Sequence, residues 1–339
     1  MDRRQFLKDA STLSGAALVV PSVLRAMEFV GPMATAHVAF VKTADRTAGV
    51  RRAIDLVGIN GFRGKDIYIK PNFNSADAPP GSTHQDTLAT IVRALKTMGA
   101  GPLTIGDRSG MGNTREVMDR KNAFTLGKEL GANVVVFDEL KADDWELIQQ
   151  PEAHWQQGFA LPRLVRKSGA IVQTCCLKTH RFGGHFTLSL KNSVGLAAKT
   201  VPGNSYNFMR ELHSSPNQRR MIAEINTAYR PDLIVLDGVQ AFVNGGPDQG
   251  KLVEANIILA GTDRVAVDAV GVALLRHFGT TPEVSQGAIF DQEQIARAVQ
   301  LKIGISGPNQ VELVTGDKES AEYAKPIRAL LDGAPASRA

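Results

Sequence analysis

The sequence GAIVQTCCLKTHRFGGHFTLSLKN, residues 169–192, is an apolar run that ends in a cluster of polar side chains. Its first part predicts a strand over Ala170–Thr174, because a short apolar segment rich in β-branched residues is typical of a strand buried on both faces. The part from Lys178 to Asn192 gathers two histidines, two lysines and several hydroxyl groups. The stretch therefore predicts a buried strand that leads directly into a functional site.

Strand patterns alternate with helical patterns through the rest of the chain. We expect an α/β fold, a mostly parallel sheet covered by helices in Rossmann-like layers, because this alternation builds parallel strand–helix–strand units. Residues 35–339 are expected to form a single large domain with an irregular insert near residues 139–162. The further expected strands are 37–41, 66–69, 102–105, 133–137, 232–236 and 257–260, and the expected helices are 44–57, 83–98 (capped by Ser82 or Thr83), 114–130, 214–229, 263–278 and 292–300.

Several of the expected strands end in polar residues. In an open parallel sheet the carboxyl ends face one edge, and ligands bind in the crevice there. We therefore expect these ends to converge on one site, although loops that follow strands are polar in many proteins. The six ends are Lys42-Thr43, Lys70-Pro71-Asn72, Gly106-Asp107-Arg108, Asp138, Lys178-Thr179-His180 and Asp237-Gly238.

Three side chains at these ends are the expected catalytic residues: His180, Asp107 and Lys178. A histidine and a lysine after a buried strand suit proton transfer and the holding of an anion. The carboxylate of Asp107 would serve as a base or as a ligand. The expected substrate-binding residues are Lys70, Asn72, Lys191, Asn192 and Asp237.

His180 and His185 are candidate metal ligands, because the glycine pair between them would let both rings turn toward one divalent ion. Two histidines make an incomplete site, which Asp107 or Asp237 would complete with oxygen. The alternative is that both are ordinary loop residues. The identity of any cofactor is left open by the sequence.

The two cysteines of the chain, Cys175 and Cys176, are adjacent within the apolar run. Packing inside the strand explains them, and metal ligation is the alternative. An iron–sulfur cluster normally needs four cysteine ligands, so none is expected.

Three further patterns have both a functional and a structural explanation. Thr187, Ser189 and Lys191 alternate, so on a strand they would share one polar face that lines a site or faces solvent. The glycine-rich turn at residues 106–113 would hold a phosphate at a helix start, or is simply a tight turn. Asp268 is the one polar residue in an apolar helical pattern, so it is expected to be buried with a partner.

The composition is that of a globular protein. The 339 residues are 43% hydrophobic and 22% charged, with a formal net charge of +5. The basic residues are scattered, so a nucleic-acid partner is not expected. A mildly basic protein is compatible with the binding of small anionic ligands.

The N-terminus carries an export pattern. Asp2-Arg3-Arg4-Gln5-Phe6-Leu7-Lys8 precedes a weakly apolar region over Ala10–Val20. This predicts a twin-arginine signal peptide at residues 1–34, transport by the twin-arginine translocase, and a periplasmic or otherwise exported protein. An uncleaved N-terminal anchor is the alternative.

Taken together, these segments resemble the domain-of-unknown-function 362 family in a stand-alone form. Many members of that family carry a fused ferredoxin-like segment with cysteine clusters, which this chain does not have. The resemblance spans residues 36–305 and implies an α/β fold, but no settled reaction and no catalytic assignment. The chain also shows a looser likeness to the α/β half of nickel-pincer racemases, and this likeness concerns the fold alone. The segments that carry the family resemblance are Ile69–Asn72, Gly106–Gly110, Leu177–His180, Thr187–Gly195, Asp237-Gly238 with Gly245–Pro247, and Thr262–Asp268.

The sequence therefore predicts an exported α/β protein that binds a small anionic substrate at the carboxyl ends of its strands, with or without a metal. Whether it is an enzyme stays open at this point. One alternative is a non-catalytic metal- or cofactor-binding maturation factor for an exported redox enzyme, and another is a structural partner of a membrane or redox complex.

Overall fold

The computed structural model describes residues 35–335, so the predicted signal peptide, residues 1–34, lies outside the described residues. The described part is built around a sheet of nine strands. Neighbouring strands are parallel except where β10 or β8 takes part, which confirms the expected mixed, mostly parallel α/β fold. In sheet order the strands are β11 (Val311–Val314), β1 (Ala36–Lys42), β10 (Gly250–Gly261), β9 (Leu233–Gly245), β7 (Ala170–His180), β2 (Ile67–Lys70), β3 (Leu103–Asp107) and β4 (Asn133–Val136), with β8 (His185–Thr187) paired to β7.

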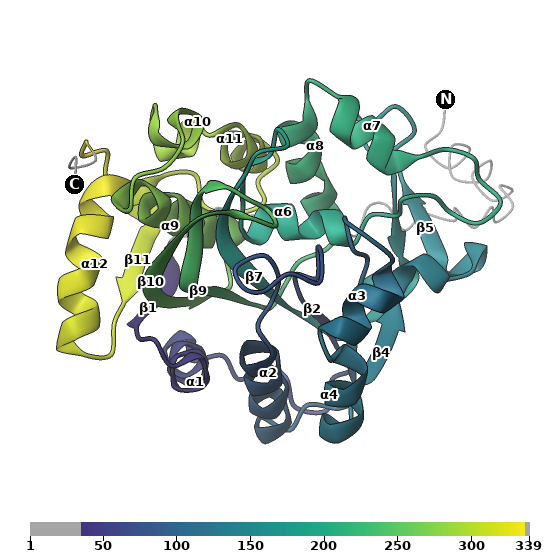
Figure 1. Cartoon of the computed structure of the whole chain (residues 1–339), viewed down its shortest axis with the longest axis horizontal. Coiled ribbons are helices and arrows are strands. Elements are labelled where there is room, and N and C mark those ends of the chain that lie inside the picture. The colour runs from purple at the N-terminus through teal and green to yellow at the C-terminus, as the bar shows by residue number, and fades with distance from the viewer. Residues whose placement is uncertain (1–34, 336–339) are drawn as a thin grey trace, which may run out of the picture. The chain divides into compact units, whose positions relative to one another are not determined.

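Helices cover both faces of this sheet (Figure 1). One face carries α1 (Arg46–Val57), α2 (Gln85–Thr97), α3 (Thr114–Arg120) and α4 (Ala123–Leu130). The opposite face carries α9 (Arg264–His277), α11 (Glu293–Gln300) and α12 (Lys318–Leu331). The remaining helices are α5 (Arg163–Lys167), α6 (Ser189–Asn192), α7 (Phe208–Ser214), α8 (Gln218–Ile225) and α10 (Pro282–Ser285). Among the described residues, none of these helices combines the length and the apolar character that crossing a membrane requires.

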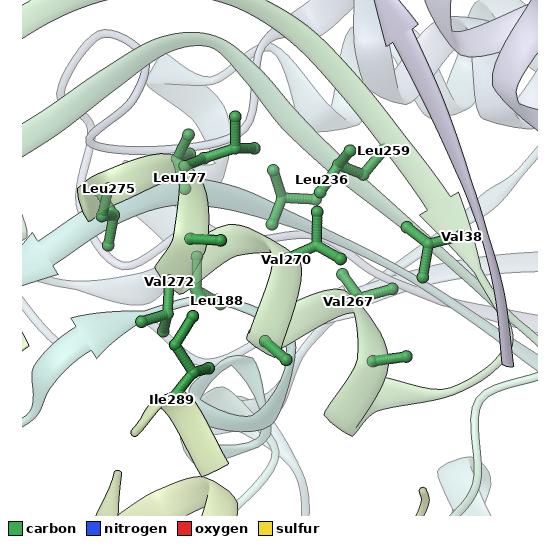
Figure 2. Packing of buried hydrophobic residues seen from close by; sticks show 14 of the residues in the cluster. Val38, Leu177, Leu188, Leu236, Leu259, Val267, Val270, Val272, Leu275 and Ile289 are labelled. Carbon is green, nitrogen blue, oxygen red and sulfur yellow. The ribbon is translucent and has the colours of Figure 1, made fainter. Parts of the chain in front are cut away.

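The central strands are buried on both faces. In β9, Leu233 and Val235 face the core beneath α1 and α2, whereas Ile234 and Leu236 face the core beneath α9. Figure 2 shows the second of these cores, in which Val267 and Val270 of α9 lie against strand residues such as Leu236. Because successive side chains of a strand enter opposite cores and both cores are apolar, the strands appear in the sequence as continuous apolar runs.

The predicted irregular insert contains a short antiparallel hairpin of β5 (Trp145–Ile148) and β6 (Phe159–Pro162). Both tryptophans pack into a third core with α7 and α8. Aromatic stacking joins this core to the main sheet, because Phe137 lies between Tyr68 of β2 and Trp145 of the hairpin.

Three predicted helix boundaries are wrong. The helix expected over 114–130 is two helices, because Asn122 adopts a left-handed conformation with φ of 55°. The cap of α2 is His84, whose side chain accepts from the N–H group of Asp86, rather than Ser82 or Thr83. The helix expected over 214–229 is shorter, since Pro216 disfavours helical conformation in the residue before it and α8 begins only at Gln218.

The strand expected over Ala170–Thr174 continues to His180, so Lys178 and His180 lie within β7 rather than after it. The extension pairs on one side with β9, through Leu177↔Ala241 and Lys178↔Phe242, and on the other side with β8, antiparallel, through Lys178↔Thr187 and His180↔His185. The chain then turns into α6 at Ser189. The prediction of one strand face shared by Thr187, Ser189 and Lys191 is therefore wrong.

Candidate functional site

A partly enclosed cavity lies where β2, β3 and β7 end, with α6 and the residues after it as its wall. The space open to the centre of a water-sized sphere is about 40 Å³. One water needs roughly 10–15 Å³ on that measure, so the cavity has room for about three waters or a compact ligand. It is lined by Lys70, Asn72, Phe73, Asn74, Asp107, Arg108, Gly110, Lys178, His180, Thr187, Lys191, Asn192, Val194, Gly195 and Pro247.

Lys70 and Asp107 form a buried ion pair, with 2.7 Å between Nζ and Oδ1. Asp107 also accepts from the backbone N–H groups of Phe73 at 2.8 Å and Arg108 at 2.7 Å. Burial raises the pKa of Asp107 and lowers that of Lys70, and each charge opposes that effect on its partner. The ionised pair is thus held by mutual attraction and by the two backbone donors.

A glycine makes room for this pair. A Cβ atom on Gly195 would lie 2.6 Å from Oδ1 of Asp107 and 2.7 Å from Nζ of Lys70. Any larger residue would push the two charged atoms apart. Gly195 therefore lets the backbone after α6 close directly over the ion pair.

Two asparagines link the lysines into one network. Asn192 accepts through Oδ1 from Lys70 Nζ at 3.2 Å and from Asn72 Nδ2 at 3.3 Å. Asn72 in turn accepts through Oδ1 from Lys178 Nζ at 3.2 Å. Lys178 also donates to the carbonyl oxygens of Gly81 at 2.5 Å and Pro247 at 3.2 Å. The three acceptors of Lys178 are therefore neutral oxygens, no carboxylate of the described residues forms an ion pair with it, and burial lowers its pKa.

Arg108 adds a further cation to the cavity wall. Its guanidinium group donates to the carbonyl oxygens of Ala197, at 2.9 Å, and of Val194. The sequence interpretation did not include Arg108 among the site residues. Its position directly after Asp107, in the Gly-Asp-Arg strand end, was the available signal.

Lys191 differs from the other cavity lysines, because no hydrogen bond or ion pair of its Nζ atom occurs among the described residues. The residue is 7% exposed. Burial, followed by the charges of Lys178 and Arg108, lowers the pKa of Lys191 to about 7. Lys191 thus presents an amine that is partly neutral near physiological pH.

His180 lies close to Lys191. A Cβ atom on Gly184 would be 2.5 Å from Cε of Lys191 and 3.0 Å from Nδ1 of His180, so both side chains pack against the same glycine. Burial, together with the charge of Lys191, holds the pKa of His180 well below its usual range. The imidazole is therefore neutral at pH 7.

Three cavity-lining residues carry buried polar atoms without a hydrogen-bond partner in residues 35–335: Asn74 through Nδ2, His180 through Nδ1 and Thr187 through Oγ1. Buried polar atoms are nearly always paired in native proteins, so each exception calls for a physical reason. A polar ligand in the cavity would supply the missing partners. Asn74 was not identified as a site residue from the sequence, and Thr187 was considered only as part of a strand face that lines a site or faces solvent.

Asp268 fixes the helix that carries Lys191 and Asn192. Its carboxylate accepts from the backbone N–H groups of Ser189 at 2.7 Å and Leu190 at 3.1 Å, which start α6. The preceding Leu188 packs on α9 beside Val272 (Figure 2). Asp268 is buried, as expected, and burial raises its pKa to about 8.

Asp237 does not line this cavity, and its role in substrate binding stays a prediction. It lies within β9, where it accepts from Arg46 at 2.9 Å and from Thr87 at 2.7 Å. The convergence expected for six strand ends is wrong for Lys42 and Asp138. Lys42 donates to the carbonyl oxygen of Ala255, and Asp138 accepts from Lys199 and Thr114.

His185 lies outside this cavity as well. It lines a second cavity of about 360 Å³ on the same measure, which shares His180 and also contains Arg181 and Glu283. No cluster of three or more His, Cys, Asp or Glu side chains suited to a metal ion occurs in residues 35–335. The two predicted ligands therefore lack a third protein partner within that range.

Burial raises the pKa of Cys175 and Cys176, both packed inside β7.

The chain matches one protein family and is similar to one protein in sequence and to another in structure. Residues 67–273 match the family described as Domain of unknown function (DUF362). A thylakoid-associated protein of Synechocystis sp. (strain PCC 6803) is 24% identical over 272 residues, which are 78% of either chain. A solved structure of lactate racemase apoprotein from Thermoanaerobacterium thermosaccharolyticum shares 14% identity with a TM-score of 0.42, over 87% of this chain and 86% of that one. Since the family match spans more than half of the sequence, the chain belongs to the DUF362 family.

Proposed function

We propose that this protein binds a small anionic substrate in the cavity at the ends of β2, β3 and β7. The observation that carries the proposal is the Nζ atom of Lys191, which has no partner among the described residues and lies in the field of Lys178 and Arg108. Like charges held together away from water are unfavourable unless an opposite charge joins them.

The charge balance of the cavity supports an anion. Four basic side chains line it, Lys70, Arg108, Lys178 and Lys191, and Asp107 is the one carboxylate in the lining. Electrostatic attraction is strong in such a partly desolvated site, because the effective dielectric constant is far below that of water. A bound anion would balance the excess charge.

The unpaired polar atoms support the same ligand. The amide of Asn74 and the hydroxyl of Thr187 are donors without acceptors, and an anion is rich in acceptors. The space of about 40 Å³ limits the part of the ligand that fits to a few non-hydrogen atoms. Carboxylates of two or three carbons suit these limits.

Isothermal titration calorimetry with oxalate tests the proposal. We expect wild-type protein to bind oxalate, and Lys191→Met to bind it at least ~10-fold more weakly, which corresponds to about 1.4 kcal/mol. Lys128→Met is the matched control, because it removes the same charge from an exposed position on α4. Equal weakening in both variants would mean that net charge, not the cavity, governs binding and would contradict the proposal.

A metal-assisted form of this function would use His180 and His185, which face each other in the β7–β8 register. Elemental analysis of protein purified without chelators tests it. Stoichiometric metal that is lost in His185→Ala would support the metal-assisted form. Oxalate binding by metal-free protein would contradict it.

Export remains part of the proposal, on the strength of the paired Arg3 and Arg4 followed by Phe6 and Leu7. The double variant Arg3→Lys, Arg4→Lys, with a reporter that fluoresces after folded export, tests it. We expect export of the unaltered sequence and retention of the variant inside the cell. Export of the variant at the unaltered rate would contradict the twin-arginine route.

A further inference from the structure

We propose that the Nζ atom of Lys191 forms an imine with a small 2-oxo acid held in this cavity. The inference rests on the proposed anion site and names its substrate class. A 2-oxo acid carries its carboxylate one bond away from a reactive carbonyl carbon, so one small cavity would hold both groups.

Lys191 is the cavity lysine whose amine is available. Nζ of Lys70 is used by Asp107, by the carbonyl oxygen of Pro71 at 2.6 Å and by Asn192. Nζ of Lys178 is likewise used by three oxygen atoms. An ammonium group has three hydrogens, so both of these lysines are fully engaged. Lys191 has no such partner among the residues described and still lines the cavity.

The surroundings of Lys191 favour a nucleophilic amine. A lysine becomes nucleophilic when it is desolvated or lies beside another cation, because both effects favour the neutral form. Lys191 meets both conditions, because it is 7% exposed and lines the cavity together with Lys178 and Arg108. The amine is thus available for attack without an external base.

The remaining groups of the wall suit the rest of the substrate. The positive charges of Lys178 and Arg108 would attract the carboxylate, and the unpaired donors of Asn74 and Thr187 would bind its oxygens. Thr187 and Lys178 are direct partners in the β7–β8 register, which places a hydroxyl and a cation next to each other. Neutral His180, packed with Lys191 against Gly184, lies in position to relay a proton.

The reaction balances without an oxidant or a reductant. The lone pair of neutral Nζ attacks the carbonyl carbon, and a C–N bond forms. The two hydrogens of the amine pass to the former carbonyl oxygen, with Nδ1 of His180 as the relay. That oxygen then leaves as water while the C=N bond forms.

Reductive trapping tests the inference. Full-length wild-type protein is incubated with glyoxylate, the smallest 2-oxo acid, and cyanoborohydride, which reduces an imine to a stable amine. Intact-mass and peptide mapping then locate the adduct. We expect modification concentrated on the peptide that contains Lys191. Glycolate, which lacks the carbonyl group, is expected to give no adduct and to slow trapping of glyoxylate by competition.

Lys191→Arg is the matched variant, because it keeps a cation but cannot form this imine. We expect it to lose the adduct while it still binds oxalate, and Lys128→Arg to trap glyoxylate like wild type. Oxalate binding by wild type without an adduct on Lys191 would overturn the inference and leave the proposed function intact. Absence of both oxalate binding and the adduct would overturn both. Total labelling that is equal in wild type and Lys191→Arg would also overturn the inference.

Discussion

Nζ of Lys70 lies 2.7 Å from Oδ1 of Asp107, and both side chains are 1% exposed. Strands that are adjacent in the sheet, β2 and β3, supply the two residues. The pair forms the floor of the cavity, and it leaves the other cations of the wall without a carboxylate of their own. This excess of basic side chains over carboxylates supports the proposed binding of an anion.

Asp107→Asn is expected to destabilise the protein by ~3–5 kcal/mol, because breaking a buried ion pair leaves one charge uncompensated. The new amide would also turn its N–H groups toward one of the two backbone donors, that of Phe73 or that of Arg108. Urea unfolding at pH 7 measures the change. Adding Lys70→Met should cost less than the sum of the two single effects, with a coupling of roughly 0.5–3 kcal/mol. Strict additivity would show that the pair does not act as a unit.

Lys191→Met is expected to stabilise the protein at pH 7 by roughly 1–2 kcal/mol, as substitutions at functional positions often do. The pKa of Lys191 is lowered from 10.5 to about 7 in the folded state. Between these values the unfolded chain holds a proton that the folded chain does not, so this group makes stability rise with pH over that window. The advantage of the variant should therefore shrink toward pH 10.5. Unfolding curves at pH 7, 8 and 9 measure it, and a pH-independent difference would contradict the assignment.

Asp268→Leu is expected to reduce both stability and anion affinity. Two buried N–H groups, of Ser189 and Leu190, would lose their acceptor, and a buried group left unsatisfied costs about 1–3 kcal/mol. Since α6 carries Lys191, its displacement would also weaken oxalate binding. Asp268→Asn keeps one acceptor and should lie between wild type and the leucine variant. Unfolding and calorimetry on the three proteins test this order, and unchanged oxalate affinity in Asp268→Leu would refute the link to α6.

Gly184→Ala is expected to lower oxalate affinity ~10-fold, or about 1.4 kcal/mol. The added methyl group would meet Cε of Lys191 at 2.5 Å and Nδ1 of His180 at 3.0 Å, so one of them must move. Gly61→Ala is the control, because the nearest atom to its added methyl group is Nζ of Lys65 at 3.8 Å. Calorimetry compares the two. Equal affinity in both variants would show that Lys191 and His180 tolerate displacement and do not contact the ligand.

The fold and part of the cavity follow from the sequence. Strand–helix alternation predicts the α/β class, and the carboxyl ends of parallel strands meet at one edge. That rule alone brings Lys70, Asn72, Asp107 and Lys178 together.

The remaining features of the fold and the cavity depend on contacts between residues far apart in the sequence. The continuation of β7 to His180 is paired with β9 and β8, and α6 starts where Asp268 binds its first N–H groups. The hydrogen bond that Asp237 accepts from Arg46 likewise depends on where α1 packs. Local periodicity carries no information about such partners, so the strand face expected for Thr187 and Lys191 was wrong.

The hydrogen bond from Lys178 to Asn72 joins residues that are 106 positions apart. The cavity wall as a whole is drawn from segments that begin at Lys70 and end at Pro247. No short segment of the chain carries the complete wall, so ligand binding and global folding are thermodynamically linked. A saturating ligand should therefore slow proteolysis at distant loops as much as at the cavity rim, which makes resistance to protease a way to screen for the natural substrate.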